Sequence, residues 1–527
     1  MSDLRTTPSL KPPVILDTKP PFSNFQYIEN RFGSLDSIHR IFSQVRLRGF
    51  QTLISEEIGS VGFSGEDDLE LVGAGIKPFP DSLVRLSFFS AEIKDASNIS
   101  SVENHNFLGY AILKKIPAGP SSYIWIVFES VITVCRHENN YLHKLRKYNV
   151  NIGGTSFTVT GVLYCQQNQL TNVCAHAALR TCISLVTPPG DISYSRMNQI
   201  LTEGGMSHGI SEGLGIEQIC LILNKLDIKY SLFSLEDAKP DDKEPPQDKK
   251  DTAKDYIIPY QYFLYSSIES GFPALLGFSL EKGGHIIPVF GHTFNEDTWV
   301  PKANASYFEI GKDTRYIPSE TWVSSYVCHD DNFGSYYCLP RYYLSNKNNP
   351  TVIAIRPNQA EYDAISAEAI AADYLYTLYK TIEREGKVNF WAKRLGKAIS
   401  EKGGWFVLRT LCMSKEDYIE HLRLLKGWDN KTIPAKLITA LNDGLPKLLW
   451  VAEISLPELF SANKRKLGEI VLDANKPVGS TQDLANFVLA RILNKIYCLE
   501  KSEKGIGLIE NNAEIDTHTD LYSNIAW

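Results

Sequence analysis

The sequence predicts a multidomain α+β protein. Its 527 residues are too many for one hydrophobic core, and 43% of them are hydrophobic, which is enough to form several cores. Segments rich in aromatic and β-branched residues indicate strands, whereas apolar residues at three- and four-residue intervals indicate helices. We therefore expect domains at 1–150, 151–345 and 350–527, with the polar segment SNKNNP at the last border.

The first domain is expected to be an α/β unit. Its strand-like segments are LVRLSFF at 83–89, FLGYAILKKI at 107–116 and SYIWIVFESVITV at 122–134. No motif in this domain indicates its role.

The third domain is expected to mix helices with strands. Helical periodicity resumes in QAEYDAISAEAIAADYLYTLYKTI, and KLLWVAEISL and LGEIVLDA read as strands. Ser414 and Asp417 have capping-box spacing, as do Ser480 and Asp483 before LANFVLARILNKIY, so we expect a helix after each pair. We expect no catalytic constellation in this domain.

Charge and composition argue against several classes of protein. Lys and Arg number 54 against 61 Asp and Glu, and a net charge of -7 provides no basic field for nucleic acid. The N-terminus carries an acid and prolines where a secretory signal needs a basic patch, and the apolar runs are shorter than a membrane helix of about 20 residues. We expect a cytoplasmic protein with reduced thiols and no nucleic-acid or membrane partner.

Cofactor motifs are missing from the sequence. Nine cysteines without a CxxC pair indicate neither a disulfide framework nor a zinc site, and no HExxH or Rossmann fingerprint occurs. The Gly-rich segment EGGMSHGISEGLG at 203–215 lacks the Gly-Lys-Ser/Thr ending of a phosphate loop, so we expect a mobile loop there. The charged, Pro-containing segment 236–255 is expected to be a disordered insertion. The sequence therefore predicts no metal and no cofactor.

A candidate nucleophile lies in the second domain. SFTVTGVLYC alternates like a strand, and the polar stretch QQNQLTN separates it from VCAHAALRTCISLV, whose apolar residues form one helical face. Cys174 falls in the first turn of this helix, with Asn172 as the expected N-cap. Free N–H groups and the positive end of the helix dipole stabilise a thiolate there. The alternative is that Cys174 is a small core residue, as most free cysteines are.

A thiolate nucleophile needs an imidazole as its base. His176 is excluded because two residues along a helix correspond to about 200° of rotation from Cys174. His285 follows two glycines at the start of a strand, which leaves room for a substrate backbone and holds the ring rigidly. His292 is the second choice, since it has the opposite strand parity and lies beyond Gly291.

Two further groups complete the candidate site. HDDNFG follows a strand-like run and offers Asp330 and Asp331 to accept the second N–H of the imidazole, although such a pair alone is more often a solvated turn. A glutamine upstream of the nucleophile can donate to the developing oxyanion. The candidates for this role are Gln166, Gln167 and Gln169.

In their order, these elements resemble the papain-like cysteine peptidase superfamily, especially the bacterial branch that includes leader-peptide-cleaving bacteriocin-processing peptidases. The matching features are the Gln-containing segment before the Cys-initiated helix, GLGIEQICLILNKLDIKYSLF, a helix before GFPALLGF, then GGHIIPVFGH and HDDNFG. The resemblance is confined to the second domain. It implies a papain-like fold there, with an N-terminal helical part followed by an antiparallel sheet.

The resemblance assigns roles to individual residues. It implies Cys174 as nucleophile, His285 as base and Asp330 as the orienting carboxylate, because Asp330 has the same distance to Gly334 as in the usual Asp-Pro-x-x-Gly turn. Asp331 replaces the proline of that turn and is the alternative orienter.

The oxyanion glutamine departs from the pattern of the family. Its usual position, six residues before the cysteine, holds Asn168, so Gln167 is the choice, one position further out. Ala175 stands where these enzymes often have glycine, which helix geometry tolerates.

The implied activity is a cysteine peptidase or related thiol hydrolase that cleaves a peptide or isopeptide bond. The same triad also serves transglutaminase-type transfer and deamidation, and a papain-like domain without turnover would act as a binding or scaffold protein. The expected partner is a protein or peptide substrate, with the first or third domain available to recruit a protein.

Overall fold

The computed structural model describes residues 3–17, 24–79, 83–119, 122–134, 140–142, 145–187, 190–206, 213–234, 259–281, 283–295, 315–385, 389–400, 405–427, 430–477, 486–502, 505–512 and 518–522. The predicted insertion at 236–255, the pair Ser480 and Asp483, and residues 207–212 of the Gly-rich segment lie outside these ranges.

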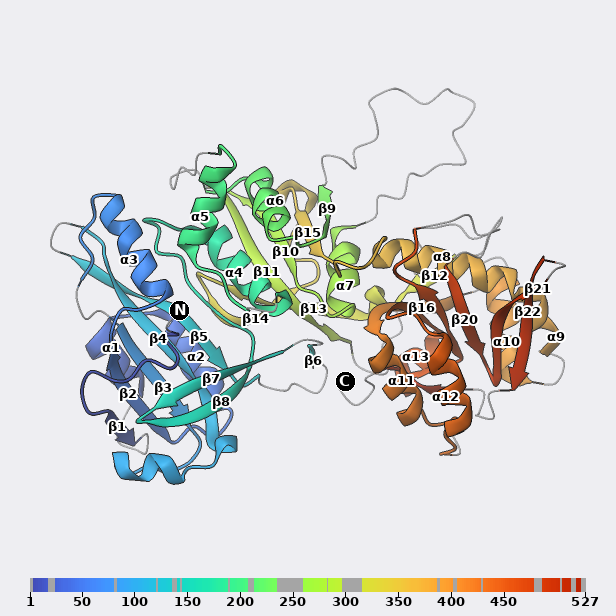
Figure 1. The fold of residues 1–527 in the computed structure, drawn as a ribbon, viewed down its shortest axis with the longest axis horizontal. Coiled ribbons are helices and arrows are strands. Elements are labelled where there is room, and N and C mark those ends of the chain that lie inside the picture. Colours follow the sequence, from blue (N-terminus) through green and yellow to red (C-terminus); the bar gives the residue numbers. More distant parts are fainter. Residues whose placement is uncertain are drawn as a thin grey trace.

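The protein has a multidomain α+β fold, as predicted. Three mixed lobes follow one another along the longest axis of the molecule, from the N-terminal sheet through a central sheet to the C-terminal sheet (Figure 1). No helix in the described part of the chain is long and apolar enough to cross a membrane.

The N-terminal lobe is an antiparallel sheet in the order β1-β2-β3-β4-β5 with helices packed against it. Because every described strand pair in this sheet is antiparallel, the lobe is α+β rather than the α/β unit expected from its sequence. Its elements are β1 (Val14–Asp17), α1 (Asn24–Phe32), α2 (Asp36–Arg46), β2 (Thr52–Ile58), α3 (Phe63–Gly73), β3 (Leu83–Phe89), β4 (Phe107–Pro117) and β5 (Tyr123–Ile132), with 3-10 turns at Ala96–Ser101 and Asn104–Asn106.

The central lobe places four described helices beside an antiparallel sheet in the order β14-β13-β11-β10-β15-β9. Buried residues of α4 form one hydrophobic core with those of α5, α6 and the N-terminal sheet. The elements are β6 (Asn140–Tyr141), α4 (Cys174–Val186), α5 (Tyr194–Glu203), α6 (Ile216–Lys225), β9 (Tyr230–Ser234), α7 (Tyr260–Glu269), β10 (Ala274–Leu280), β11 (Gly283–Phe294), β13 (Val323–Asp330), β14 (Gly334–Pro340) and β15 (Thr351–Ile355), with short 3-10 turns at Ser319–Trp322 and Asn346–Asn348. The hairpin of β7 (Arg146–Ile152) and β8 (Thr155–Gly161) is a separate two-stranded sheet beside β4 and β5 of the N-terminal lobe (Figure 1).

The C-terminal lobe has its own core and sheet, in the order β12-β16-β17-β19-β20-β21-β22. Its elements are β12 (Arg315–Pro318), α8 (Ala364–Thr377), α9 (Tyr379–Glu385), α10 (Phe390–Ser400), β16 (Trp405–Ser414), α11 (Lys415–Leu424), α12 (Ala435–Gly444), β17 (Leu448–Ser455), α13 (Pro457–Asn463), β18 (Arg465–Lys466), β19 (Gly468–Asp473), β20 (Phe487–Ile492), β21 (Lys495–Ser502), β22 (Gly505–Asn512) and β23 (Thr519–Asp520).

Two strands join the sheet of the neighbouring lobe. β12 precedes the end of the central lobe in sequence but pairs in parallel with β16 of the C-terminal sheet. β15 follows the polar segment at 345–350 but lies between β10 and β9 of the central sheet. The chain therefore crosses between these two lobes more than once.

The first predicted capping pair lies at a helix start, whereas the segment after the second pair forms strands. Ser414 caps α11 by accepting the N–H of Asp417, which confirms the first capping pair. The helix expected in LANFVLARILNKIY is wrong, because this segment forms the hairpin of β20 and β21. Its turn contains Leu493 at φ 57°, a conformation that glycine or asparagine usually provides, so the sequence carried no ordinary hairpin signal.

Candidate active site

Helix α4 begins at Cys174, as predicted, and presents this half-buried thiol at its first turn. The prediction that Asn172 is the N-cap is wrong, because Val173 occupies the cap position. The side-chain oxygen of Asn172, Oδ1, accepts the backbone N–H of Asn168 instead. The residues that follow in α4 are almost all buried against the rest of the central lobe. The helix dipole and the free N–H groups of the first turn are therefore fixed beside the sulfur.

Strand β11 brings His285 to this thiol. The thiol of Cys174 lies close enough to the imidazole of His285 to raise its pKa, although more than a hundred residues separate the two in sequence. His285 pairs with Phe278 of β10, whose ring packs edge-on against the imidazole at 5.5 Å. The strand starts at Gly283 with φ +129°, a backbone conformation that residues other than glycine rarely adopt. The nucleophile and the base proposed from the sequence thus meet in the structure.

The turn between β13 and β14 supplies two carboxylates to the same imidazole. His285 Nε2 lies 3.2 Å from Asp330 Oδ2 and 3.6 Å from Asp331 Oδ1. The other oxygen of Asp330 accepts the backbone N–H groups of Asn332 and Phe333, which fixes the orientation of this carboxylate. Because Nε2 faces the carboxylates, Nδ1 is the ring nitrogen left for Cys174.

The electrostatics of this cluster favour a protonated imidazole. Burial of His285 opposes the charge, but the hydrogen bonds to Asp330 and Cys174 and the negative charges of both aspartates outweigh it and raise its pKa to about 10. Burial also opposes ionisation of Asp330, yet the hydrogen bond to His285 lowers the pKa of this carboxyl overall. A positive ring beside the sulfur stabilises a thiolate.

Asp331 is in a different electrostatic state from its neighbour. Burial, together with the nearby charge of Asp330, raises the pKa of Asp331 to about 6 despite the attraction of His285. Its Oδ2 atom is buried and has no hydrogen-bond partner among the described residues. Of the two carboxylates, Asp330 is therefore the better placed to orient the imidazole.

The three candidate glutamines take different positions. The Gln167 side chain lies close enough to the carboxyl of Asp331 to lower its pKa slightly, so it lies at the site. Gln166 donates to the backbone carbonyl of Asp331 at 2.8 Å and accepts from Ser37 and from the Val127 N–H.

The remaining residues of this loop do not reach the catalytic groups. Gln169 is exposed and has a positive φ of 57°. Asn168 is buried and accepts the N–H groups of Leu170, Thr171 and Asn172, which organises the loop before α4. Gln167 is thus the glutamine placed to serve as an oxyanion donor.

No family model, no curated protein and no solved structure matches this chain.

The two rival histidines have structural partners. His176 is buried, accepts the Val173 N–H at Nδ1 and lies 2.8 Å from Asn198 Oδ1 through Nε2. His292 is fully buried, with Nε2 2.6 Å from Glu269 Oε2. Both rings are thus engaged away from Cys174, as the helical rotation and the strand parity indicated.

Residues of the N-terminal lobe hold the aspartate turn in place, and no sequence pattern indicated them. Arg40 of α2 donates to the backbone carbonyls of Ser335 and Tyr336 at 2.7 and 2.6 Å. Gln44, one turn later, donates to the same Ser335 carbonyl at 2.8 Å. A Cβ atom on Gly334 would come within 3.0 Å of Arg40, so glycine permits this close approach. Helix α2 therefore holds the turn that carries the two aspartates.

His285, Asp330 and Asp331 also form a group that could hold a metal ion, since their ligand atoms lie within 4.8 Å of one another. A metal would need the neutral imidazole as its ligand. Without a metal, the two carboxylates raise the pKa of His285 and favour its protonated form, so a metal ion would have to displace this proton. The group therefore fits a hydrogen-bonded triad better than a metal site.

Proposed function

We propose that this protein is a thiol hydrolase that cleaves a peptide or isopeptide bond, with Cys174 as nucleophile, His285 as base and Asp330 as orienter. The observation that carries the proposal is the connected arrangement of thiol, imidazole and carboxylate, in which His285 contacts both other groups. Nucleophilic catalysis by cysteine requires this order of contacts. The helix α4 packed beside an antiparallel sheet also supports a papain-like fold for the central lobe.

The proposed reaction proceeds through an acyl-enzyme. The Cys174 thiolate attacks the substrate carbonyl carbon and forms a C–S bond, while the Cys174 N–H and Gln167 donate to the oxyanion. His285 gives its proton to the leaving amine as the C–N bond breaks. Water then attacks the thioester and gives a proton to His285; the C–S bond breaks, and a carboxylic acid leaves.

The active thiol requires a reducing environment. All eight cysteines that the structure describes are free thiols, and none of them pairs with another in a disulfide. We therefore place the protein in the cytoplasm, where thiols stay reduced.

A peptide library tests the proposal. The full chain is incubated with mixed peptides and with an isopeptide-linked peptide pair, and products are identified by mass spectrometry. We expect cleavage by the wild type and by Cys220→Ala, a matched variant of a half-buried cysteine on α6, and none by Cys174→Ala. Cleavage that persists in Cys174→Ala contradicts the proposal.

The same spectra separate the related activities. Hydrolysis gives two shorter peptides, deamidation keeps the length and converts a side-chain amide to a carboxylate, and transfer to an added amine joins the two molecules. If the wild type produces none of these, the central lobe acts as a binding or scaffold domain.

A further inference from the structure

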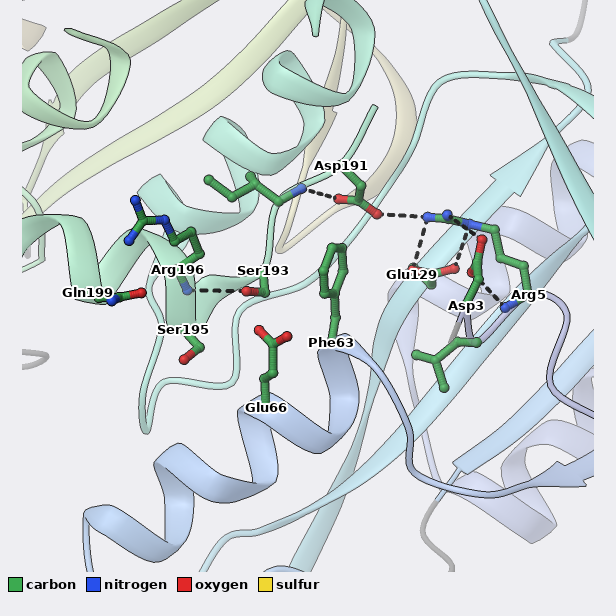
Figure 2. Close-up of a pocket in the computed structure, with 12 residues that line it drawn as sticks. Asp3, Arg5, Phe63, Glu66, Glu129, Asp191, Ser193, Ser195, Arg196 and Gln199 are labelled. Carbon is green, nitrogen blue, oxygen red and sulfur yellow. Dashed lines mark hydrogen bonds and ion pairs between the residues drawn. The ribbon is translucent and has the colours of Figure 1, made fainter. Parts of the chain in front are cut away.

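A second cavity lies away from Cys174, where the N-terminal lobe meets the central lobe. Its volume is about 580 Å³, within the range of small-molecule sites. In Figure 2, Phe63 and Glu66 project from α3 toward the loop that carries Ser193, and Arg5 closes the opposite side. The lining residues come from the N-terminal segment (Asp3, Leu4, Arg5), α3 (Phe63, Glu66), β5 (Glu129), the loop before α5 (Asp191, Ile192, Ser193) and α5 (Ser195, Arg196, Gln199).

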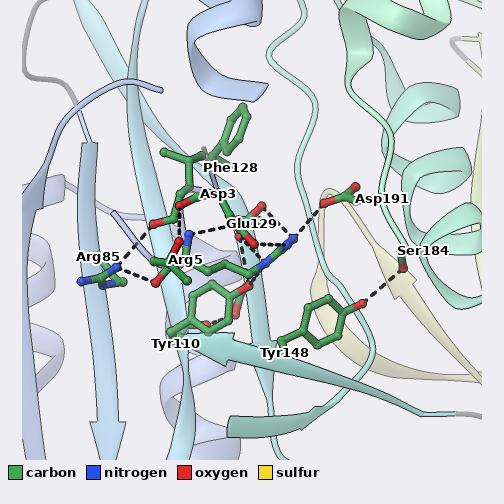
Figure 3. A network of polar contacts seen from close by, with 12 residues as sticks. Asp3, Arg5, Arg85, Tyr110, Phe128, Glu129, Tyr148, Ser184 and Asp191 are labelled. Carbon is green, nitrogen blue, oxygen red and sulfur yellow. Dashed lines mark hydrogen bonds and ion pairs between the residues drawn. The ribbon is translucent and has the colours of Figure 1, made fainter. Parts of the chain in front are cut away.

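One wall of the cavity already binds a guanidinium group. Arg5 lies 2.8 Å from Asp191 Oδ2 and 3.0 Å from Glu129 Oε1, and donates to the hydroxyl of Tyr110 at 2.8 Å (Figure 3). Burial opposes its charge, yet these neighbours raise the pKa of Arg5 well above its usual value. The chain itself thus shows that a guanidinium is stable against these carboxylates.

The charges of that wall are balanced within the protein. Arg180 of α4 binds the same two acids, with 2.7 Å to Glu129 Oε2 and 2.9 Å to Asp191 Oδ1. Two guanidinium groups therefore face two carboxylates, and the buried pairs leave no free anion in that wall.

The opposite wall is not balanced. Within the described residues, the Glu66 carboxylate has no hydrogen-bond or ion-pair partner, and it lines the cavity beside Phe63. Arg196, the other cation of the lining, pairs instead with Glu203 along its own helix at 3.3 Å. The four carboxylates of the lining, on Asp3, Glu66, Glu129 and Asp191, face the guanidinium groups of Arg5, Arg196 and, from outside the lining, Arg180, so Glu66 is the carboxylate left unpaired among the described residues. The cavity therefore favours a cation.

We infer that this cavity binds a guanidinium group on a short aliphatic stem, with Glu66 accepting from the head group and Phe63 and Ile192 contacting the stem. A planar guanidinium forms charge-assisted hydrogen bonds with a carboxylate and packs on an aromatic ring. Such a group belongs either to a small alkylguanidine or to an arginine side chain of a peptide. This inference does not depend on the proposed hydrolase activity.

Isothermal titration of the full chain tests the inference with two probes. Agmatine represents a free alkylguanidine, and N-acetyl-arginine methylamide represents an arginine in a peptide. N-acetyl-citrulline methylamide is the neutral control of the same shape. We expect saturable binding of at least one cationic probe, with the citrulline compound about tenfold weaker or more, because it lacks the charge. Tighter binding of agmatine or of the arginine compound identifies the source.

Variants locate the binding site. Glu66→Gln should weaken the cationic probe about tenfold, whereas Glu217→Gln, an exposed glutamate at the start of α6, should leave it unchanged. Binding of neither probe, equal binding of the citrulline compound, or equal affinity in Glu66→Gln would overturn the inference. The comparison of the cationic probes with the citrulline compound uses the wild type, so it tests the inference even if Glu66→Gln folds poorly.

Discussion

His285 Nε2 lies 3.2 Å from Asp330 Oδ2, and this contact joins two strands of the central sheet, β11 and β13, at the end next to helix α4. Asp331 follows in the chain and reaches the same nitrogen at 3.6 Å. The His285 imidazole therefore contacts two carboxylates whose pKa values are shifted in opposite directions. Asp330 is held by backbone N–H groups and has a lowered pKa, whereas Asp331 has a pKa raised to about 6.

The two aspartates should differ when each is changed to asparagine. Asp330→Asn removes the acceptor that orients His285, and we expect kcat to fall about 10²-fold or more. Asp331→Asn removes a buried carboxyl whose ionisation is unfavourable, so we expect a loss of kcat below about tenfold and an unchanged or higher Tm. Steady-state kinetics and thermal denaturation of both variants measure these effects. A larger kcat loss in Asp331→Asn would reverse the assignment of the orienter.

The stability of the protein should depend on pH through His285. Its pKa rises from 6.5 to about 10 on folding, so protonation favours the folded state. This contribution is fully present below pH 6.5 and is lost as pH rises through about 10. Urea unfolding of the wild type and of His285→Gln, measured across this range, should give a stability difference that shrinks with rising pH. A difference that stays constant or grows would show that the imidazole is not protonated in the folded protein.

Helix α2 should act on catalysis by positioning the aspartate turn. Arg40→Met keeps the aliphatic stem but removes the donors to the Ser335 and Tyr336 carbonyls, so we expect kcat to fall about tenfold with a smaller change in KM. Arg40→Lys should restore part of the loss. Arg46→Met, an exposed residue of the same helix, is the matched control. Equal kinetics for Arg40→Met and the control would show that α2 does not position the site.

His292 should affect folding rather than chemistry. Its partner Glu269 also binds Arg409 of β16, so this buried pair links the central and C-terminal lobes. Removing His292 takes one of two partners from the buried Glu269 carboxylate and leaves a cavity, so His292→Ala should lower the free energy of unfolding by about 3 kcal/mol. In the folded fraction of this variant, alkylation of Cys174 should keep its wild-type rate. A selective loss of that reactivity would make His292 the base.

Local patterns predicted the parts of the site that depend on one segment. The start of α4 at Cys174, the strand carrying His285 and the strand ending at Asp330 all follow from short-range periodicity and from glycine positions. The hairpin in 487–502 was missed because Leu493 replaces the usual turn residue.

Other features depend on contacts between distant segments. Adjacent glutamines have the same chemistry, and only the tertiary fold directs the Gln167 side chain to Asp331 and the Gln166 side chain to its backbone carbonyl. Arg40 and Ser335 lie 295 residues apart, so no periodicity links them. For this reason, sequence patterns could not predict that α2 of the N-terminal lobe holds the aspartate turn.

Selective alkylation of Cys174 tests the proposed thiol and imidazole pair. The wild type and His285→Ala are treated with iodoacetamide near neutral pH, and the modified cysteines are followed by mass spectrometry, with exposed Cys338 as the internal control. We predict that Cys174 reacts about tenfold faster than Cys338 or more, because its thiolate is paired with an imidazolium, and that this advantage disappears in His285→Ala. Slow labelling of Cys174 at the rate of Cys338, or labelling unaffected by His285→Ala, would contradict the proposed chemistry.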